Sequence, residues 1–96
     1  MKRKYQTWDE YLDETLNDPV DAAHYLTADA EENDPAFMLL ALSQVARARG
    51  VSKTAREASI SRMGLYKALS KNGNPGFKTF LRVLKAAGMQ LEFKPA

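Results

Sequence analysis

The sequence predicts an all-α fold of five to six helices that contains a helix-turn-helix and ends in a short C-terminal β-strand. Apolar residues recur at helical spacing through most of the chain. Good N-cap residues, Thr7, Asp18 and Asp34, stand directly before three of these segments. The last residues alternate between apolar and polar side chains, which is typical of a strand.

The length of 96 residues suits one domain, or one domain with a small extension. We divide the chain into an acidic N-terminal helical extension, residues 1–34, and a helix-turn-helix domain with the C-terminal strand, residues 35–96. No apolar run approaches the roughly 18 residues that would span a bilayer, so we expect no membrane partner. The basic start, Met1 to Lys4, precedes Trp8-Asp9-Glu10 and not an apolar segment, so we predict no signal peptide and a cytoplasmic protein.

The net charge of +2 conceals an uneven distribution of charge along the chain. Residues 1–34 carry three basic and ten acidic side chains, and residues 35–96 carry eleven basic and two acidic ones. A basic body favours a polyanionic partner, because each neutralised phosphate releases counterions. The acidic part would repel DNA and suit a basic protein partner. The two parts could equally attract each other within one fold.

The capping box formed by Thr7 and Glu10 predicts a first helix that runs to about Leu16. Its side chains Trp8, Tyr11, Leu12 and Leu16 are expected to dock on the body of the protein.

A second helix starts at Asp18-Pro19, where Asp caps the helix and Pro fits its first position. It should extend to about Glu32, with an apolar stripe formed by Ala22, Ala23, Leu26 and Ala30.

A third helix starts in the same way at Asp34-Pro35 and should run to Arg49, with Gly50 ending it. The segment from Ala36 to Leu42 is apolar on every face, which indicates a central helix that is buried on several sides. In its second half Gln44, Arg47 and Arg49 should point outward. The two arginines could bind phosphate or complement the negative end of the helix.

The segment Ser52–Leu69 predicts a helix, a tight turn and a second helix. Ser52 would cap the first helix, Ser59-Ile60 would form the turn, and Ser61 would cap the second helix. Because Leu65 and Leu69 are four residues apart, they would face the core together. The alternative interpretation is a plain helical hairpin with a solvated basic face.

A helix-turn-helix that binds DNA places its second helix in the major groove. We therefore predict Arg62, Met63, Tyr66 and Lys67 as the residues that read bases, with Arg62 the best match to guanine. Phosphate contacts, which position the protein on the duplex, are predicted for Ser52, Lys53, Arg56, Ser61, Lys71, Asn72 and Asn74.

The turn-rich segment from Ser70 to Gly76 leads into a last helix over about 77–87. Its side chains Phe77, Phe80, Leu81 and Leu84 are predicted to face the core, and Lys78, Arg82 and Lys85 to face solvent. The predicted strand follows over 89–94. A lone strand needs a partner, which could be a symmetry mate, the sheet of another protein or the Lys2–Gln6 segment. We favour a homodimer built around this tail, with Met89, Leu91 and Phe93, or around the last helix. The alternative is a tail that pairs only when a partner protein binds.

Nothing in the sequence predicts an enzyme, a cofactor or a metal site. Cysteine is absent, and His24, the single histidine, has no ligand-spaced neighbours. The carboxylates of residues 9–34 are spread over separate helix starts, which favours a solvated acidic surface over a catalytic pair.

Several of these segments together resemble one known family. They are D-P-V-D-A-A-H-Y-L (18–26), N-D-P-A-F-M-L-L-A-L-S-Q-V-A-R-A-R-G (33–50), S-I-S-R-M-G-L-Y-K-A-L-S (59–70), G-N-P (73–75) and F-L-R-V-L-K-A-A-G-M-Q-L (80–91). The chain resembles the probable addiction module antidote proteins, a branch of the HigA-like antitoxins with a Cro/C1-type (lambda repressor-like) helix-turn-helix. It departs from the family at Ser59, where glycine is common, and at the Met63-Gly64 pair.

The resemblance implies an antitoxin of a type II toxin–antitoxin module. Such proteins neutralise a RelE/HigB-type mRNA-cleaving toxin and repress their own operon by binding palindromic, double-stranded operator DNA as homodimers. From the charge distribution we add that Asp9, Glu10, Asp13 and Glu14 could contact the toxin. The alternative is a stand-alone phage-type repressor with no toxin partner.

Overall fold

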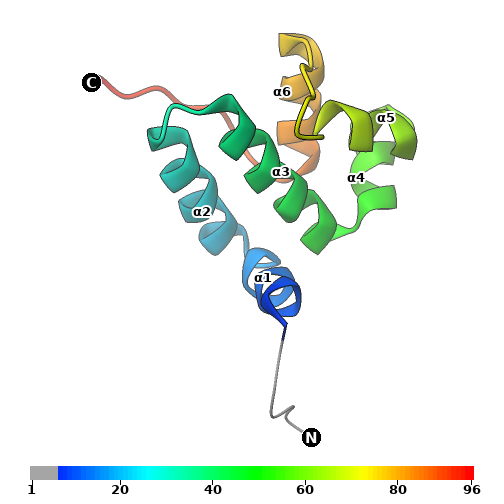
Figure 1. Cartoon of the computed structure of the whole chain (residues 1–96), viewed down its shortest axis with the longest axis horizontal. Coiled ribbons are helices and arrows are strands. Elements are labelled where there is room, and N and C mark those ends of the chain that lie inside the picture. The colour runs from blue at the N-terminus through cyan, green and yellow to red at the C-terminus, as the bar shows by residue number, and fades with distance from the viewer. Residues whose placement is uncertain (1–6) are drawn as a thin grey trace, which may run out of the picture.

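The computed structural model describes residues 7–96, and this part of the chain folds into six helices (Figure 1). The all-α class predicted from the sequence is therefore confirmed. The helices are α1 (Trp8–Leu16), α2 (Pro19–Glu31), α3 (Pro35–Arg49), α4 (Val51–Glu57), α5 (Arg62–Ala68) and α6 (Phe77–Ala86). None of them is both long and apolar enough to cross a bilayer.

The first three helices start where the capping residues predicted. The Thr7 hydroxyl accepts a hydrogen bond from the Glu10 amide at 3.1 Å. Asp18 accepts from the Val20 amide at 2.8 Å, and Asp34 accepts from the Ala36 amide at 2.9 Å. Each oxygen satisfies one of the backbone N–H groups that a helix start leaves without a partner, so these boundaries follow from local chemistry.

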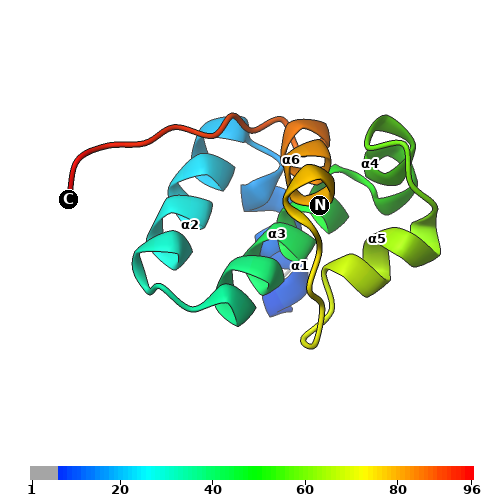
Figure 2. The ribbon, with the colours of Figure 1, turned by 90° about the horizontal axis from the view of Figure 1, so that it is seen from above.

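Helix α3 lies at the centre of the fold, between α1 and α2 on one side and α4 on the other (Figures 1 and 2). Its side chains Leu42 and Val45 are fully buried. The apolar cluster around them draws on every helix and comprises Leu12, Leu16, Ala22, Leu26, Leu39, Ala41, Leu42, Val45, Ala46, Ala55, Ala58, Leu65, Leu69, Val83, Leu84, Ala86 and Ala87. This cluster includes residues on both sides of Asp34 and does not mark a boundary there. The proposed division into residues 1–34 and 35–96 therefore stays a prediction.

The apolar start of α3 is less covered than its composition predicted. Leu39, Ala41 and Leu42 are buried, but Phe37 and Leu40 are each about half exposed. The prediction that Trp8 and Tyr11 dock on the body is also wrong, since Leu12 and Leu16 alone bury the inner face of α1. These four large apolar side chains remain at the surface.

Helix α3 joins α4 through Gly50, which ends one helix and precedes the next with a φ of 106°. A side chain is strained at this φ, and glycine is not. The prediction that Ser52 caps α4 is wrong, because the helix already starts at Val51 and no side chain caps it. The buried Thr54 hydroxyl donates instead to the Gly50 carbonyl at 2.9 Å and fixes this corner.

The buried face of α6 differs from the predicted one. Phe80 and Leu84 pack on the core as expected, but Phe77 is 68% exposed and Leu81 is 37% exposed. Val83 and Ala87 are buried in their place. The helix has apolar side chains on more than one face, so spacing alone did not decide which face packs inward.

The predicted C-terminal strand is wrong, because residues 89–96 form neither helix nor strand in the structure. The Met89 amide donates to the Leu84 carbonyl at 3.0 Å and completes the end of α6, with Gly88 at a φ of 81°. Residues 90–96 make no backbone hydrogen bond within the described chain. Alternation predicts which side chains share a face, but a strand also requires a neighbour to bond with. The predicted pairing with Lys2–Gln6 lies outside the described residues.

Two glycines in the loop between α5 and α6 provide a matched test of packing. A Cβ at Gly73 would lie 2.3 Å from the Ala68 carbonyl oxygen, whereas a Cβ at Gly76 would meet nothing within 4 Å. We expect Gly73→Ala to lower the free energy of unfolding by roughly 1–3 kcal/mol, because the backbone must shift. Gly76→Ala should change it by no more than about 0.5 kcal/mol. Urea unfolding followed by circular dichroism measures both, and equal midpoints would contradict this geometry.

Candidate nucleic-acid interface

The turn between α4 and α5 lies at Ser59-Ile60, where it was predicted. Ser59 adopts a left-handed conformation with a φ of 61°. This allows the Ile60 amide to donate to the Ala55 carbonyl at 3.0 Å, which closes the end of α4. The Ser61 hydroxyl then accepts from the Gly64 amide at 2.9 Å and starts α5. The predicted turn and second cap are confirmed.

Helix α5 buries one face and exposes the other, as the spacing predicted. Leu65 and Leu69 are buried, while Met63 is 76% exposed and Tyr66 is 53% exposed. Arg62 and Lys67 are exposed on the same helix. All four predicted base-reading side chains are therefore accessible to a partner.

Arg62 and Tyr66 form a pair on the exposed face of α5. The guanidinium of Arg62 donates to the Tyr66 hydroxyl at 3.3 Å, and its carbon lies 5.9 Å from the ring centre. The spacing of four residues could have predicted this contact, but the sequence interpretation did not pair the two residues. The contact limits the directions in which Arg62 extends from the helix.

The residues predicted to contact phosphate come from α4, the turn and the loop after α5. Ser52, Lys53 and Arg56 are exposed on α4, and Lys71, Asn72 and Asn74 are exposed in the loop. The Ser61 hydroxyl is already engaged as the cap of α5. Basic side chains therefore precede and follow α5 along the chain. Within residues 7–96, no group of three or more His, Cys, Asp or Glu side chains could hold a metal ion.

Comparison with known proteins identifies the family. The family model of the probable addiction module antidote protein matches residues 5–95, which is nearly the whole chain. The chain belongs to this family. An uncharacterized protein of Haemophilus influenzae is 48% identical over 68 residues, which cover 71% of this chain and 70% of that protein. No solved structure matches the chain significantly.

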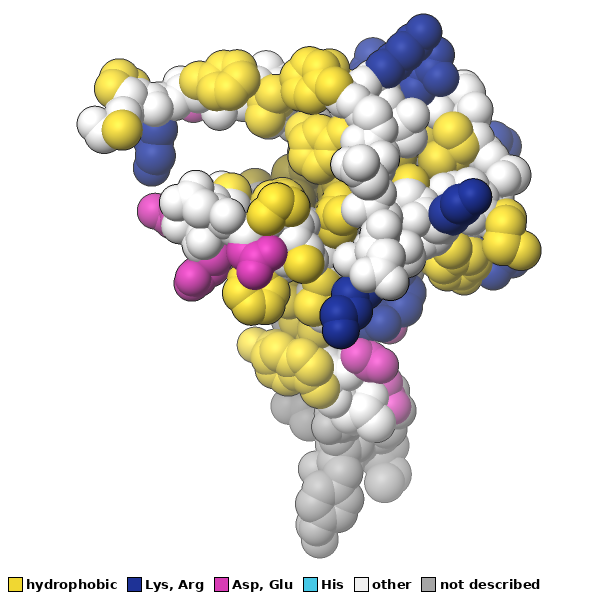
Figure 3. All heavy atoms as spheres, turned by 45° about the horizontal axis from the view of Figure 1, so that its top comes forward, with side chains coloured by type: hydrophobic (Ala, Val, Ile, Leu, Met, Phe, Trp, Pro, Cys, Tyr) yellow, Lys and Arg dark blue, Asp and Glu magenta, His cyan; other side chains and the backbone are white. Residues whose placement is uncertain are grey.

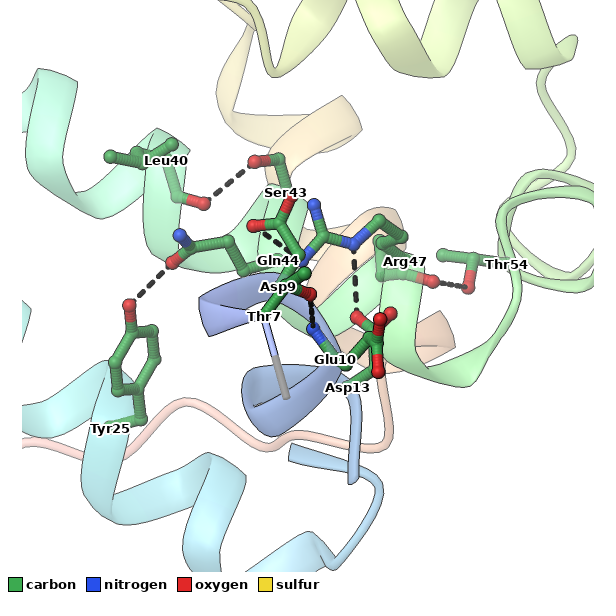
Figure 4. Close-up of polar contacts among 11 residues, drawn as sticks. Thr7, Asp9, Glu10, Asp13, Tyr25, Leu40, Ser43, Gln44, Arg47 and Thr54 are labelled. Carbon is green, nitrogen blue, oxygen red and sulfur yellow. Dashed lines mark hydrogen bonds and ion pairs between the residues drawn. The ribbon is translucent and has the colours of Figure 1, made fainter. Parts of the chain in front are cut away.

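The chain links its acidic and basic parts through Arg47 (Figure 4). The guanidinium Nε lies 2.9 Å from an Asp13 carboxylate oxygen, and a terminal nitrogen lies 3.5 Å from Asp9. The hydrogen bond that the Arg47 guanidinium donates to Asp13 is the main cause that raises the pKa of Arg47 above its ordinary value. Arg47 was predicted to bind phosphate or a helix end, and the sequence did not indicate a contact with α1, 34 residues away.

Arg47 also lies close to α5. Together with Tyr66 and Leu69 it lines a shallow depression of about 280 Å³ between α3 and α5. Two of the four carboxylates predicted to contact a partner, Asp9 and Asp13, are therefore bound to an arginine that lies beside α5.

The other polar side chains of α3 face inward more than predicted. Gln44 accepts a hydrogen bond from the Tyr25 hydroxyl, which ties α2 to α3 (Figure 4). Burial is the main cause that raises the pKa of Tyr25, and Asp29 adds to it. Arg49 lies against Gly88, where a Cβ would come within 3.1 Å of its guanidinium. Its charge is therefore placed at the C-terminal end of α6, which a cation stabilises.

The pair of Arg47 with Asp13 should contribute little to stability, because both side chains are about 40% exposed. A double-mutant cycle with Arg47→Gln and Asp13→Asn should give a coupling free energy of roughly 0.2–1 kcal/mol, and salt should reduce it. Asp9→Asn is the matched control, and its longer contact should couple less. A coupling above about 2 kcal/mol in urea unfolding would show a buried, structural ion pair instead.

Proposed function

We propose that this antidote protein binds palindromic operator DNA as a homodimer, represses its own operon, and neutralises a RelE/HigB-type mRNA-cleaving toxin. The observation that carries the DNA-binding part is the exposed face of α5, where Arg62, Met63, Tyr66 and Lys67 point away from a helix that Leu65 and Leu69 fix to the core. The family assignment supports an antidote over a stand-alone repressor.

Arg62 is the proposed reader of guanine. An arginine side chain donates two parallel hydrogen bonds to O6 and N7 of guanine in the major groove. Arg62 lies in the first turn of α5, the part of a recognition helix that contacts base edges. The Tyr66 hydroxyl holds one of its nitrogens at 3.3 Å, so less conformational freedom is lost on binding. Met63 would contact a thymine methyl group, and Lys67 a base or a phosphate.

Phosphate contacts would come from the segments before and after α5. Lys53 and Arg56 project from α4, and Lys71 projects from the loop. Ser52, Asn72 and Asn74 add neutral donors in the same segments. Such contacts fix the position of the protein on the duplex and give an affinity that falls steeply with salt.

The proposed homodimer would form through the C-terminal segment. Leu91 is 42% exposed and Phe93 is 85% exposed, while Met89 packs partly on the core. Leu81 of α6 is exposed beside them and lines a shared groove with Met89 and Leu91. A second copy would bury these apolar side chains and place two α5 helices on one palindrome.

The proposed toxin contact lies on the acidic part of the molecule. Glu10 and Glu14 share α1 with Asp9 and Asp13, and residues 7–46 contain ten carboxylates and no lysine or arginine. A basic toxin would be attracted to this surface, and the attraction would raise its association rate.

Replacing Arg62 with alanine and replacing Lys53 with alanine should affect DNA binding differently. Arg62→Ala should cost roughly 1–3 kcal/mol on the operator and relax the base preference at one position. Lys53→Ala should weaken operator and random DNA about equally and reduce the salt slope by about 1. Fluorescence anisotropy with both duplexes over a salt series measures this. If Arg62→Ala weakens both duplexes equally, Arg62 contacts only the backbone.

Growth assays test the neutralising role. Expression of the toxin gene from the same module should stop growth, and co-expression of this chain should restore it. A variant with Glu10→Gln and Glu14→Gln should restore growth less well, because the attraction to a basic toxin is weaker. The matched control is Glu31→Gln with Glu32→Gln at the end of α2, and full rescue by both variants would argue against a toxin contact on α1.

A further inference from the structure

Two aromatic side chains on α1 are exposed although the helix buries its inner face well. Trp8 is 64% exposed and Tyr11 is 49% exposed. Their rings stack on each other, with centres 5.5 Å apart and planes inclined by 25°. The stack holds both rings in one orientation at the surface. A preordered aromatic pair of this kind loses little entropy when a partner covers it.

Further apolar side chains are exposed at the start of α3. Phe37 is 49% exposed and Leu40 is 53% exposed, and the three-residue spacing places them on neighbouring positions of the helix surface. Figure 3 shows hydrophobic side chains gathered in a band down one face of the molecule, with acidic side chains on both sides of its lower part. Bands of this kind, rimmed by charge, are typical of protein-binding surfaces.

We propose that the Trp8–Tyr11 stack, together with the exposed Phe37 and Leu40 of α3, forms the apolar anchor through which this protein binds a basic protein partner. The inference rests on the proposed function, so the partner is the toxin of the same module. The carboxylates of α1 then form the charged rim of the interface, and the aromatic pair forms its centre. Aromatic residues at the centre of an interface commonly provide most of the binding free energy.

The charge of this surface decides between the toxin and the other partners. Residues 7–46 contain ten carboxylates and no lysine or arginine, so DNA is repelled. A symmetric contact with a second copy would place the same patch against itself and oppose like charges. A basic protein meets no such repulsion. The proposed operator contacts lie on α4, α5 and the following loop, which are separate from α1 and the start of α3.

The packing of α1 suits a rigid interface. Leu12 and Leu16 are each 2% exposed and fix the helix to the core, while Arg47 holds Asp9 and Asp13 on the flank of α1. The ion pairs leave both carboxylates partly exposed, so their charge still acts on a partner. The anchor therefore does not have to fold on binding.

Isothermal titration of the full chain with the purified toxin tests the anchor. Trp8→Ala and Leu40→Ala should each weaken toxin binding roughly 10-fold or more. The matched control is Val20→Ala, because Val20 is 62% exposed in the same acidic part but lies on α2. It should change the affinity less than about 2-fold. All three variants should stay folded and bind operator DNA with wild-type affinity, because none of them replaces a side chain of the buried core.

Trp8 is the single tryptophan of the chain, so its fluorescence reports directly on this surface. Subtracting the emission spectrum of Trp8→Phe from that of wild type isolates the emission of Trp8. This emission should shift to shorter wavelength when the toxin is added, because the ring leaves water. The same shift on concentrating the chain without toxin would show that a second copy covers the stack, which overturns the proposal.

The outcomes separate this inference from the proposed function. If wild type binds the toxin but Trp8→Ala and Leu40→Ala bind it as tightly, the anchor is wrong and the antitoxin role stands. If wild type neither binds the toxin nor restores growth, the proposed neutralising role fails, and the anchor fails with it.

Discussion

The burial of α3 is the constraint on which the rest of the structure depends. Leu42 and Val45 are completely inaccessible, and α1, α2 and α4 each pack against the helix that carries them. Fully burying one such side chain contributes roughly 1.5–3 kcal/mol, several times what an exposed ion pair provides. The helix therefore holds an acidic surface and a basic surface in one small molecule, and the attraction between them is not needed to maintain the fold.

The sequence predicted the features that depend on neighbours along the chain. Asp18 and Asp34 cap their helices, and Ser61 caps α5, because the atoms that bond are two or three residues apart. The turn at Ser59 also follows from local backbone geometry. The candidate site was predictable to the same extent, since the four-residue spacing of Leu65 and Leu69 decides which side of α5 faces outward.

The failures share a different cause. The tail after Met89 alternates like a strand, but a strand exists only with a partner, and no spacing rule supplies one. Helical spacing predicted that Phe77 faces the core, and Trp8 was expected to dock on the body, yet both remain exposed. Arg47 finds Asp13 across 34 residues, which is a tertiary contact that sequence distance does not reveal. Exposed aromatic residues and an unpaired tail are the features that a missing partner would leave.

The weakness of the Arg47 contacts bears on how the proposed DNA and toxin surfaces coexist. Arg47 lies at the edge of α5, beside Tyr66, and its carboxylate partners lie on α1, beside the aromatic stack. An exposed pair contributes about 1 kcal/mol or less, so it positions α1 without neutralising the field of ten carboxylates. A strong, buried ion-pair network at this junction would instead neutralise the charges through which each surface attracts its own partner. Because apolar packing supplies the stability and the Arg47 contacts stay weak, both proposed surfaces remain available.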